Sequence, residues 1–496
     1  MRTRTIVIGL SFVVILIVLA IVFIPQMLKT ERGSSQTYFP TIGWRTNTPE
    51  EQGFDSNKLA EGLQALQRNN INIDSLLIIR NGYVILDAYF YPYDNSIPHK
   101  LASVTKSFTT TLIGIAVNQG KIQLDQPIIS FFPDRTIANL DARKESITVR
   151  HLISNMNGFE SGCLTGDEST LNTMRSNPDW VQAALDRKVV EEPGTRFCYD
   201  SPGMHLLSAI LQAATGMTEL DFARQNLFEP LGINEVFWQS DPQGYTHGWG
   251  DLFLKPRDAA KIGYLWLNNG MWDGKQIVSE AWVADSVQSH SRGGMDDYGY
   301  GWWVSEDSYY AFGRGGQNVK IYPAYNMIIV TTASGMDYDQ ISTLLIAAFI
   351  DPNKPLPANL TSVAKLETTV TAVDQAPQPW PIGALPDNAG AISGKTYVFG
   401  PNIVEVATLR LEFSDNTEAK LYMNLEGRDV IWPIGLDGNY RLEPEGLALR
   451  GYWDDPQTFV LDIFEDGLST FTLHFEDDHV ILDAHGLKFE GQVENP

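Results

Sequence analysis

The stretch "HKLASVTKSFTTTLIGIAVNQG", residues 99–120, decides the interpretation of the fold because it places a serine three residues before a lysine where a helix begins. Apolar residues recur at helical spacing after Lys106, and Gly120 is typical of a helix end. Unpaired backbone N–H groups at a helix start favour negative charge on Ser103, and Lys106 follows almost one turn later on the same face. This spacing indicates a nucleophilic serine with a lysine as its proton partner.

Two simpler interpretations compete with this one. The chain contains a second S-x-x-K, Ser362 to Lys365 in "NLTSVAKLE", which lies in a proline-rich region with no strand before it and no clear helical pattern after it. We reject that match for lack of context. For Ser103 the alternative is a helix N-cap beside a solvated lysine, and residues 99–120 alone do not exclude it.

The surrounding chain alternates strand and helix patterns. Two apolar runs flank Asn81-Gly82 in "DSLLIIRNGYVILDAYF", which is the strongest short signal for a β-hairpin. Helical segments dominate from about 103 to 230, and strand patterns return in "YGYGWWVS", "SYYAFGRGGQNVKIYP" and "YNMIIVTTAS". The order predicts an α+β fold, in which helices flank an antiparallel sheet completed from both ends of the sequence and a mostly helical insert separates the strands.

The sequence predicts four segments. Residues 1–33 are expected to be an N-terminal membrane anchor with its flanks, because Ile6 to Ile24 carry no charge and no small-x-small cleavage site follows. The hydrolase-sized α+β unit is expected over residues 34–350 and a proline-rich linker over residues 351–390. Residues 391–496 alternate apolar and polar side chains, which predicts a small all-β barrel or sandwich. An uncleaved anchor would place the bulk of the protein outside the cytoplasm.

Charge and cysteine content limit the partners and cofactors that we expect for this protein. The chain has 60 acidic and 36 basic residues and a net charge of −24, so it repels nucleic-acid backbones, and no nucleic-acid partner is expected. No C-x-x-C or H-E-x-x-H pattern occurs, and neither a metal nor another cofactor is expected. The two cysteines, Cys163 and Cys198, are compatible with one disulfide or with two separate buried thiols.

Three ordered stretches resemble the serine β-lactamase and penicillin-binding-protein superfamily. They are S-x-x-K at Ser103, "YDS" beginning at Tyr199, and "GRGG" around Arg314, which correspond to its S-x-x-K, Y-x-N and K-T-G elements. The resemblance covers roughly residues 45 to 350. It is strongest to the branch of class C β-lactamases, D-alanyl-D-alanine carboxypeptidases, family VIII-type esterases and 6-aminohexanoate-dimer hydrolases. It implies a serine β-lactamase-like hydrolase domain.

The resemblance also implies a role for each matching residue. Ser103 would be acylated, and Lys106 and Tyr199 would share the proton transfers. The backbone N–H groups of Ser103 and Gln317 would form the oxyanion hole.

Two departures from the family pattern bear on the substrate. Ser201 stands where the family has an asparagine, and Arg314, Gly315 and Gly316 stand in place of K-T-G. We expect these four residues to contact substrate. The changes favour small ester, amide or peptide-like substrates, with D-alanyl-D-alanine carboxypeptidase or β-lactamase activity at the same serine as the alternative. A non-catalytic, membrane-tethered binding module is the alternative from another class.

Overall fold

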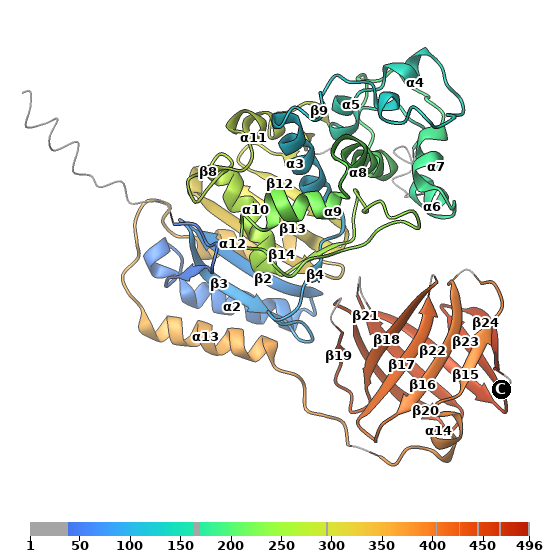
Figure 1. The fold of residues 1–496 in the computed structure, drawn as a ribbon. Coiled ribbons are helices and arrows are strands. Elements are labelled where there is room, and N and C mark those ends of the chain that lie inside the picture. The colour runs from blue at the N-terminus through green and yellow to red at the C-terminus, as the bar shows by residue number, and fades with distance from the viewer. Residues whose placement is uncertain are drawn as a thin grey trace, which may run out of the picture. The chain divides into compact units, whose positions relative to one another are not determined.

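The computed structural model describes residues 38–161, 169–293, 296–381, 383–402, 404–425, 427–443, 446–465 and 468–494. Figure 1 shows helices around one sheet in the first part of the chain and a separate all-β unit in the last part. The chain is therefore an α+β protein with a C-terminal β-barrel-like domain, as the sequence predicted.

The sheet begins with the predicted hairpin. Strands β2 (Ile73–Arg80) and β3 (Tyr83–Tyr89) pair antiparallel and are joined by Asn81 and Gly82. Both turn residues have positive φ, 52° and 75°, as a type I′ turn requires. Asparagine and glycine are the residues that reach this conformation at the lowest cost.

Strands from the two ends of the sequence complete this nine-stranded sheet. The central strand β14 (Met327–Ala333) pairs with β2 on one side and with β13 (Gln317–Tyr322) on the other. Every residue of β14 is buried, because helices cover both faces of the sheet. The remaining strands of the sheet are β1 (Arg45–Thr46), β9 (Ser291–Arg292), β10 (Asp297–Tyr298), β11 (Trp303–Val304) and β12 (Tyr309–Gly313).

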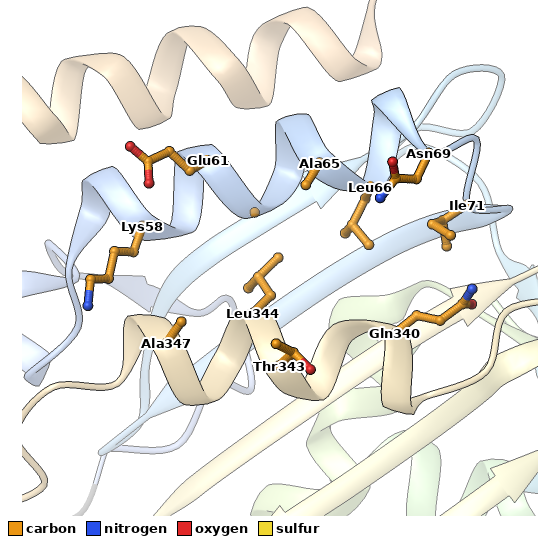
Figure 2. Close-up of a pocket in the computed structure, with 11 residues that line it drawn as sticks. Lys58, Glu61, Ala65, Leu66, Asn69, Ile71, Gln340, Thr343, Leu344 and Ala347 are labelled. Carbon is orange, nitrogen blue, oxygen red and sulfur yellow. The ribbon is translucent and has the colours of Figure 1, made fainter.

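Helices α2 (Ser56–Arg68) and α12 (Asp339–Ala348) pack together on one face of the sheet. A Cβ atom on Gly62 would lie 2.1 Å from Leu344 Cδ1, so only glycine allows this approach. Figure 2 shows the shallow pocket between the two helices, which contains none of the predicted site residues. On the other face, Gly263 of α10 (Pro256–Leu267) lies close to β13 and β14.

The insert between β3 and β9 is mostly helical, as predicted, and its long helices α3 (Thr105–Asn118) and α8 (Ser201–Thr215) pack against each other. Most residues of both helices are buried, including polar residues in the first turns of α3. The shorter helices of the insert are α4 (Ala142–Ser146), α5 (Val149–Ile153), α6 (Ser169–Arg175), α7 (Trp180–Asp186), α9 (Glu219–Ala223) and α11 (Glu280–Ser286).

Within the predicted linker the structure contains a 15-residue helix, α13 (Leu360–Asp374). Its Leu366 and Val373 join the buried cluster formed by α2, α12 and the sheet. The sequence pattern around Ser362 did not reveal this helix, because only a narrow apolar stripe of α13 is buried and the rest faces solvent.

The C-terminal domain is a ten-stranded sheet with antiparallel neighbours, and β18 also pairs in parallel with β20, so that the sheet closes on itself. Side chains alternate between a buried interior and the outer surface, as in Ala419 and Leu421 of β17 (Glu418–Leu425). The other elements are α14 (Asp387–Ile392), β15 (Thr396–Phe399), β16 (Val406–Phe413), β18 (Arg428–Gly435), β19 (Arg441–Leu442), β20 (Ala448–Asp455), β21 (Thr458–Phe464), β22 (Leu468–Glu476), β23 (His479–Ala484) and β24 (Leu487–Val493).

The prediction of a membrane-anchored protein with an extracytoplasmic catalytic domain requires correction. Among the described residues no helix is both long and apolar enough to cross a bilayer. The longest of them, α8 and α13, have 15 residues each, about 22 Å at 1.5 Å per residue, against a hydrocarbon core of about 30 Å. The stretch from Ile6 to Ile24, on which the prediction rested, lies outside the described residues.

Candidate active site

Ser103 and Lys106 form a direct contact at the start of the helix that the sequence predicted. Ser103 lies in a short 3₁₀ turn (Ala102–Val104) that leads into α3. Lys106 is 1% exposed, and its Nζ donates hydrogen bonds to Ser103 Oγ at 2.8 Å and to the backbone oxygen of Trp249 at 2.9 Å. The solvated lysine of the simpler interpretation is therefore excluded. A buried amine held at this distance is placed to exchange a proton with the hydroxyl.

The backbone around Ser103 is under steric constraint. Ala102 adopts a left-handed conformation with φ of 44°, which is unfavourable for a residue with a Cβ atom and is often found at functional sites. Gly313, the last residue of β12, approaches closely: a Cβ atom there would lie 2.7 Å from the Leu101 oxygen and 3.0 Å from Ser103 N. The end of β12, an internal strand of the sheet, thus packs against the backbone of the candidate nucleophile. A glycine at the end of a predicted strand is the one sequence signal of this close approach.

Tyr199 lies beside the same lysine. Lys106 Nζ is 4.7 Å from the centroid of the Tyr199 ring, and the indole of Trp303 stacks on this ring at 5.9 Å with an interplanar angle of 19°. The fully buried Tyr298 meets Tyr199 edge to face at 6.3 Å. The packing of α8 on α3 therefore brings Ser103, Lys106 and Tyr199 together across more than ninety positions of sequence.

The predicted substrate-binding residues occupy two places. Ser201 is the first residue of α8 and is 2% exposed. Arg314, Gly315 and Gly316 form the turn between β12 and β13, and both glycines have positive φ, 88° and 105°. The turn is fixed from behind, because the Gly315 oxygen accepts hydrogen bonds from the backbone N–H groups of residues 335 and 336, each at 2.9 Å.

Gln317 directly follows this turn as the first residue of β13, paired with Gly313. Its side chain bonds back to the sheet: Nε2 donates to the Ala333 oxygen, and Oε1 accepts from Ala333 N at 3.1 Å. Both polar atoms of the Gln317 side chain are therefore used in hydrogen bonds that stabilise the fold. The backbone N–H of Gln317 as an oxyanion donor stays a prediction.

Cys198 precedes Tyr199 and is disulfide-bonded. The other cysteine of the sequence, Cys163, lies outside the described residues. No group of three or more His, Cys, Asp or Glu side chains suited to holding a metal ion occurs in the described ranges.

Electrostatics around the site are dominated by burial. Desolvation raises the pKa of Tyr298 well above its usual value, and the neighbouring Tyr199 adds to this effect. Behind α3, desolvation also raises the pKa of Glu219 from 4.5 to about 7. The hydroxyls of Thr109 and Ser208 face this carboxyl group and lower its pKa, but by less than burial raises it.

Comparison with known proteins agrees with this geometry. Residues 59–347, more than half of the chain, match the Beta-lactamase family. The 6-aminohexanoate-dimer hydrolase of Paenarthrobacter ureafaciens is 25% identical over 319 residues, which cover 59% of this chain and 81% of that protein. Protein flp of Staphylococcus aureus strain COL is 27% identical over 179 residues, or 34% of this chain and 36% of that protein.

Among solved structures, EstCE1, a hydrolase with promiscuous acyltransferase activity, superposes with a TM-score of 0.50 at 18% identity. The match covers 59% of this chain and 99% of that one, and at this identity it supports the fold alone.

The fold and the Ser–Lys–Tyr cluster define the class of serine hydrolases that carry S-x-x-K at the start of a buried helix. The chain belongs to the Beta-lactamase family. The predicted superfamily is thereby confirmed, and with it the expectation of a serine hydrolase.

Proposed function

We propose that the protein cleaves small esters or amides through an acyl-enzyme on Ser103. The observation that carries this proposal is the hydrogen bond of 2.8 Å between Lys106 Nζ and Ser103 Oγ, in a site where the Tyr199 ring lies against the same amine. These three groups supply a nucleophile and two proton carriers within one cluster.

In the proposed reaction Ser103 Oγ attacks the substrate carbonyl carbon while its proton passes to the pair of Lys106 and Tyr199. The carbonyl oxygen becomes negative and is stabilised by backbone N–H donors, of which Ser103 N is one. Collapse of the tetrahedral intermediate breaks the ester or amide bond, and the proton moves from Tyr199 to the departing alcohol or amine. Water then attacks the acyl-enzyme with the same groups acting in reverse, which releases the acid and restores Ser103.

Two features support small esters or amides over β-lactams. Ser201 lacks the side-chain amide that the resemblance assigns to contact with the acylamino group of a β-lactam, and its side chain is almost fully buried. Arg314 retains a cation at the turn after β12, where a substrate carboxylate can bind, but no threonine hydroxyl accompanies it.

The test is labelling of the full-length protein with a fluorophosphonate probe and, separately, with a fluorescent penicillin, with intact mass to count adducts. Ser103→Ala should abolish labelling. Ser362→Ala is the matched control, since Ser362 is a half-buried residue of α13 in the other S-x-x-K match. Fluorophosphonate labelling alone supports the proposal, and labelling by both probes supports peptidoglycan or β-lactam chemistry instead. Labelling by neither probe overturns the enzyme proposal in favour of a binding module.

A further inference from the structure

Asp200, the residue after Tyr199, forms a buried ion pair with its side chain. Asp200 stands at the N-cap of α8, where an aspartate normally accepts hydrogen bonds from the first turn of the helix, yet its side chain makes no cap bond. The carboxylate instead meets the guanidinium of Arg187 in two hydrogen bonds of 2.6 and 3.0 Å. The side chains of Asp200 and Arg187 are 1% and 10% exposed, so the pair is nearly shielded from water.

The surroundings hold this carboxylate in one orientation. Asn157 Nδ2 donates to Asp200 Oδ2 at 2.9 Å, and a Cβ atom on Gly203 would lie 2.5 Å from the same oxygen. On the other side, the Arg187 guanidinium lies 4.5 Å from the centroid of the Phe159 ring. Bidentate geometry and close packing together favour the observed rotamer of Asp200.

A second contact fixes the backbone on both sides of Tyr199. The backbone oxygen of Asn155 accepts from Cys198 N at 2.8 Å, and its side-chain Oδ1 accepts from Asp200 N at 3.1 Å. Asn155 is fully buried with φ of 54°, a left-handed conformation that asparagine adopts more readily than most residues. One residue thus binds the two neighbours of the candidate proton carrier.

We propose that Asn155, Arg187 and Asp200 form a bracket that positions Tyr199 against Lys106. They are positioning residues, since they act through Tyr199. This inference rests on the proposed function, because it assigns the bracket to the proton transfers of that reaction.

Stability alone does not account for the ion pair. Replacing a buried pair with neutral side chains of similar size often leaves stability unchanged or increases it, because the pair must be desolvated. By contrast, a displacement of about 1 Å of a proton carrier costs about 10²-fold in rate. The location of the pair one residue from Tyr199 fits the second role.

The charge of Asp200 has a further consequence for proton transfer. The ring of Tyr199 faces Lys106, Tyr298 and Trp303, and Asp200 is its neighbour along the chain. If Arg187 is shortened, the carboxylate is less well neutralised, and a nearby negative charge disfavours a tyrosinate. The pH profile of kcat should then move towards higher pH.

The experiment compares two double variants of the full-length protein in hydrolysis of a p-nitrophenyl ester. Arg187→Met with Asp200→Asn removes the bracket pair and leaves no unpaired buried charge. Arg135→Met with Asp179→Asn is the control, because this pair also lies in the insert, at 2.8 Å, and Asp179 is the N-cap of α7 and not a chain neighbour of Tyr199. Thermal midpoints of both variants report on folding.

We expect kcat of the bracket variant to fall about 10²-fold with KM changed by less than about twofold, while the control retains kcat. Arg187→Lys, which keeps the charge but loses the bidentate contact, should give an intermediate kcat and a pH profile displaced towards higher pH. Equal kcat in the bracket and control variants overturns the bracket proposal and leaves the proposed function standing. An inactive wild-type protein that also resists fluorophosphonate overturns both.

Discussion

Burial of Glu219 makes the stability of the hydrolase domain depend on pH in a way that one substitution can remove. Glu219 is 0% exposed, and the polar groups that face its carboxyl group are the hydroxyls of Thr109 and Ser208. Desolvation raises its pKa from 4.5 to about 7, so between these two pH values the folded protein keeps a proton that the unfolded chain releases. The contribution of Glu219 to the free energy of unfolding is therefore fully present below pH 4.5 and is lost as the pH rises to about 7.

The size of this effect follows from the shift. Each pKa unit corresponds to 1.36 kcal/mol, so the wild-type protein should lose about 3 kcal/mol across this interval through Glu219 alone. Glu219→Gln has nearly the same shape and no charge to bury. Relative to wild type, the free energy of unfolding of the variant should therefore rise with pH from 4.5 to 7 and then level off.

Urea unfolding at pH values from 4 to 8, followed by tryptophan fluorescence, measures this difference. Any constant cost of burying the amide cancels in the comparison between pH values. Glu145→Gln, at an exposed position of α4, is the control for the substitution itself. A difference between Glu219→Gln and wild type that does not change with pH would refute the reasoning.

Three further predictions concern packing and protonation. Gly313→Ala places a Cβ atom 2.7 Å from the Leu101 oxygen and 3.0 Å from Ser103 N, so the backbone must shift. We expect a loss of kcat of about 10²-fold in ester hydrolysis together with a lower thermal midpoint; unchanged kcat would show that the end of β12 does not set the position of Ser103. Gly62→Ala places a Cβ atom 2.1 Å from Leu344 Cδ1 and should lower the free energy of unfolding by about 1–3 kcal/mol without affecting kcat. His99 is fully buried, and desolvation lowers its pKa from 6.5 to about 4, so stability through this group is lost as pH falls from 6.5 to 4. His99→Gln should remove about 3 kcal/mol of this acid sensitivity, and an unchanged acid-unfolding midpoint would contradict the assignment.

Several parts of this protein could be predicted from sequence because their signals are local. Asn81-Gly82 predicts a hairpin since the turn itself needs positive φ, and the alternating side chains of residues 391–496 predict an all-β barrel or sandwich since one face of each strand must be buried. The spacing of Ser103 and Lys106 places both on one face of a helix whatever surrounds it.

Other features appear only when distant segments meet. The sequence reveals neither the contact of Gly313 with Ser103 nor the stacking of Trp303 on Tyr199, because both depend on how strands β11 and β12 pack against the helical insert. The sequence does not reveal the Arg187–Asp200 pair either. Asp200 stands at the N-cap of α8, but its carboxylate accepts hydrogen bonds from the guanidinium of Arg187 and not from the first turn of the helix. The sequence by itself determined which chemical groups are present and which local turns and helices carry them. The tertiary structure decided their burial, distances and charge environment, because those depend on packing between residues far apart in the chain.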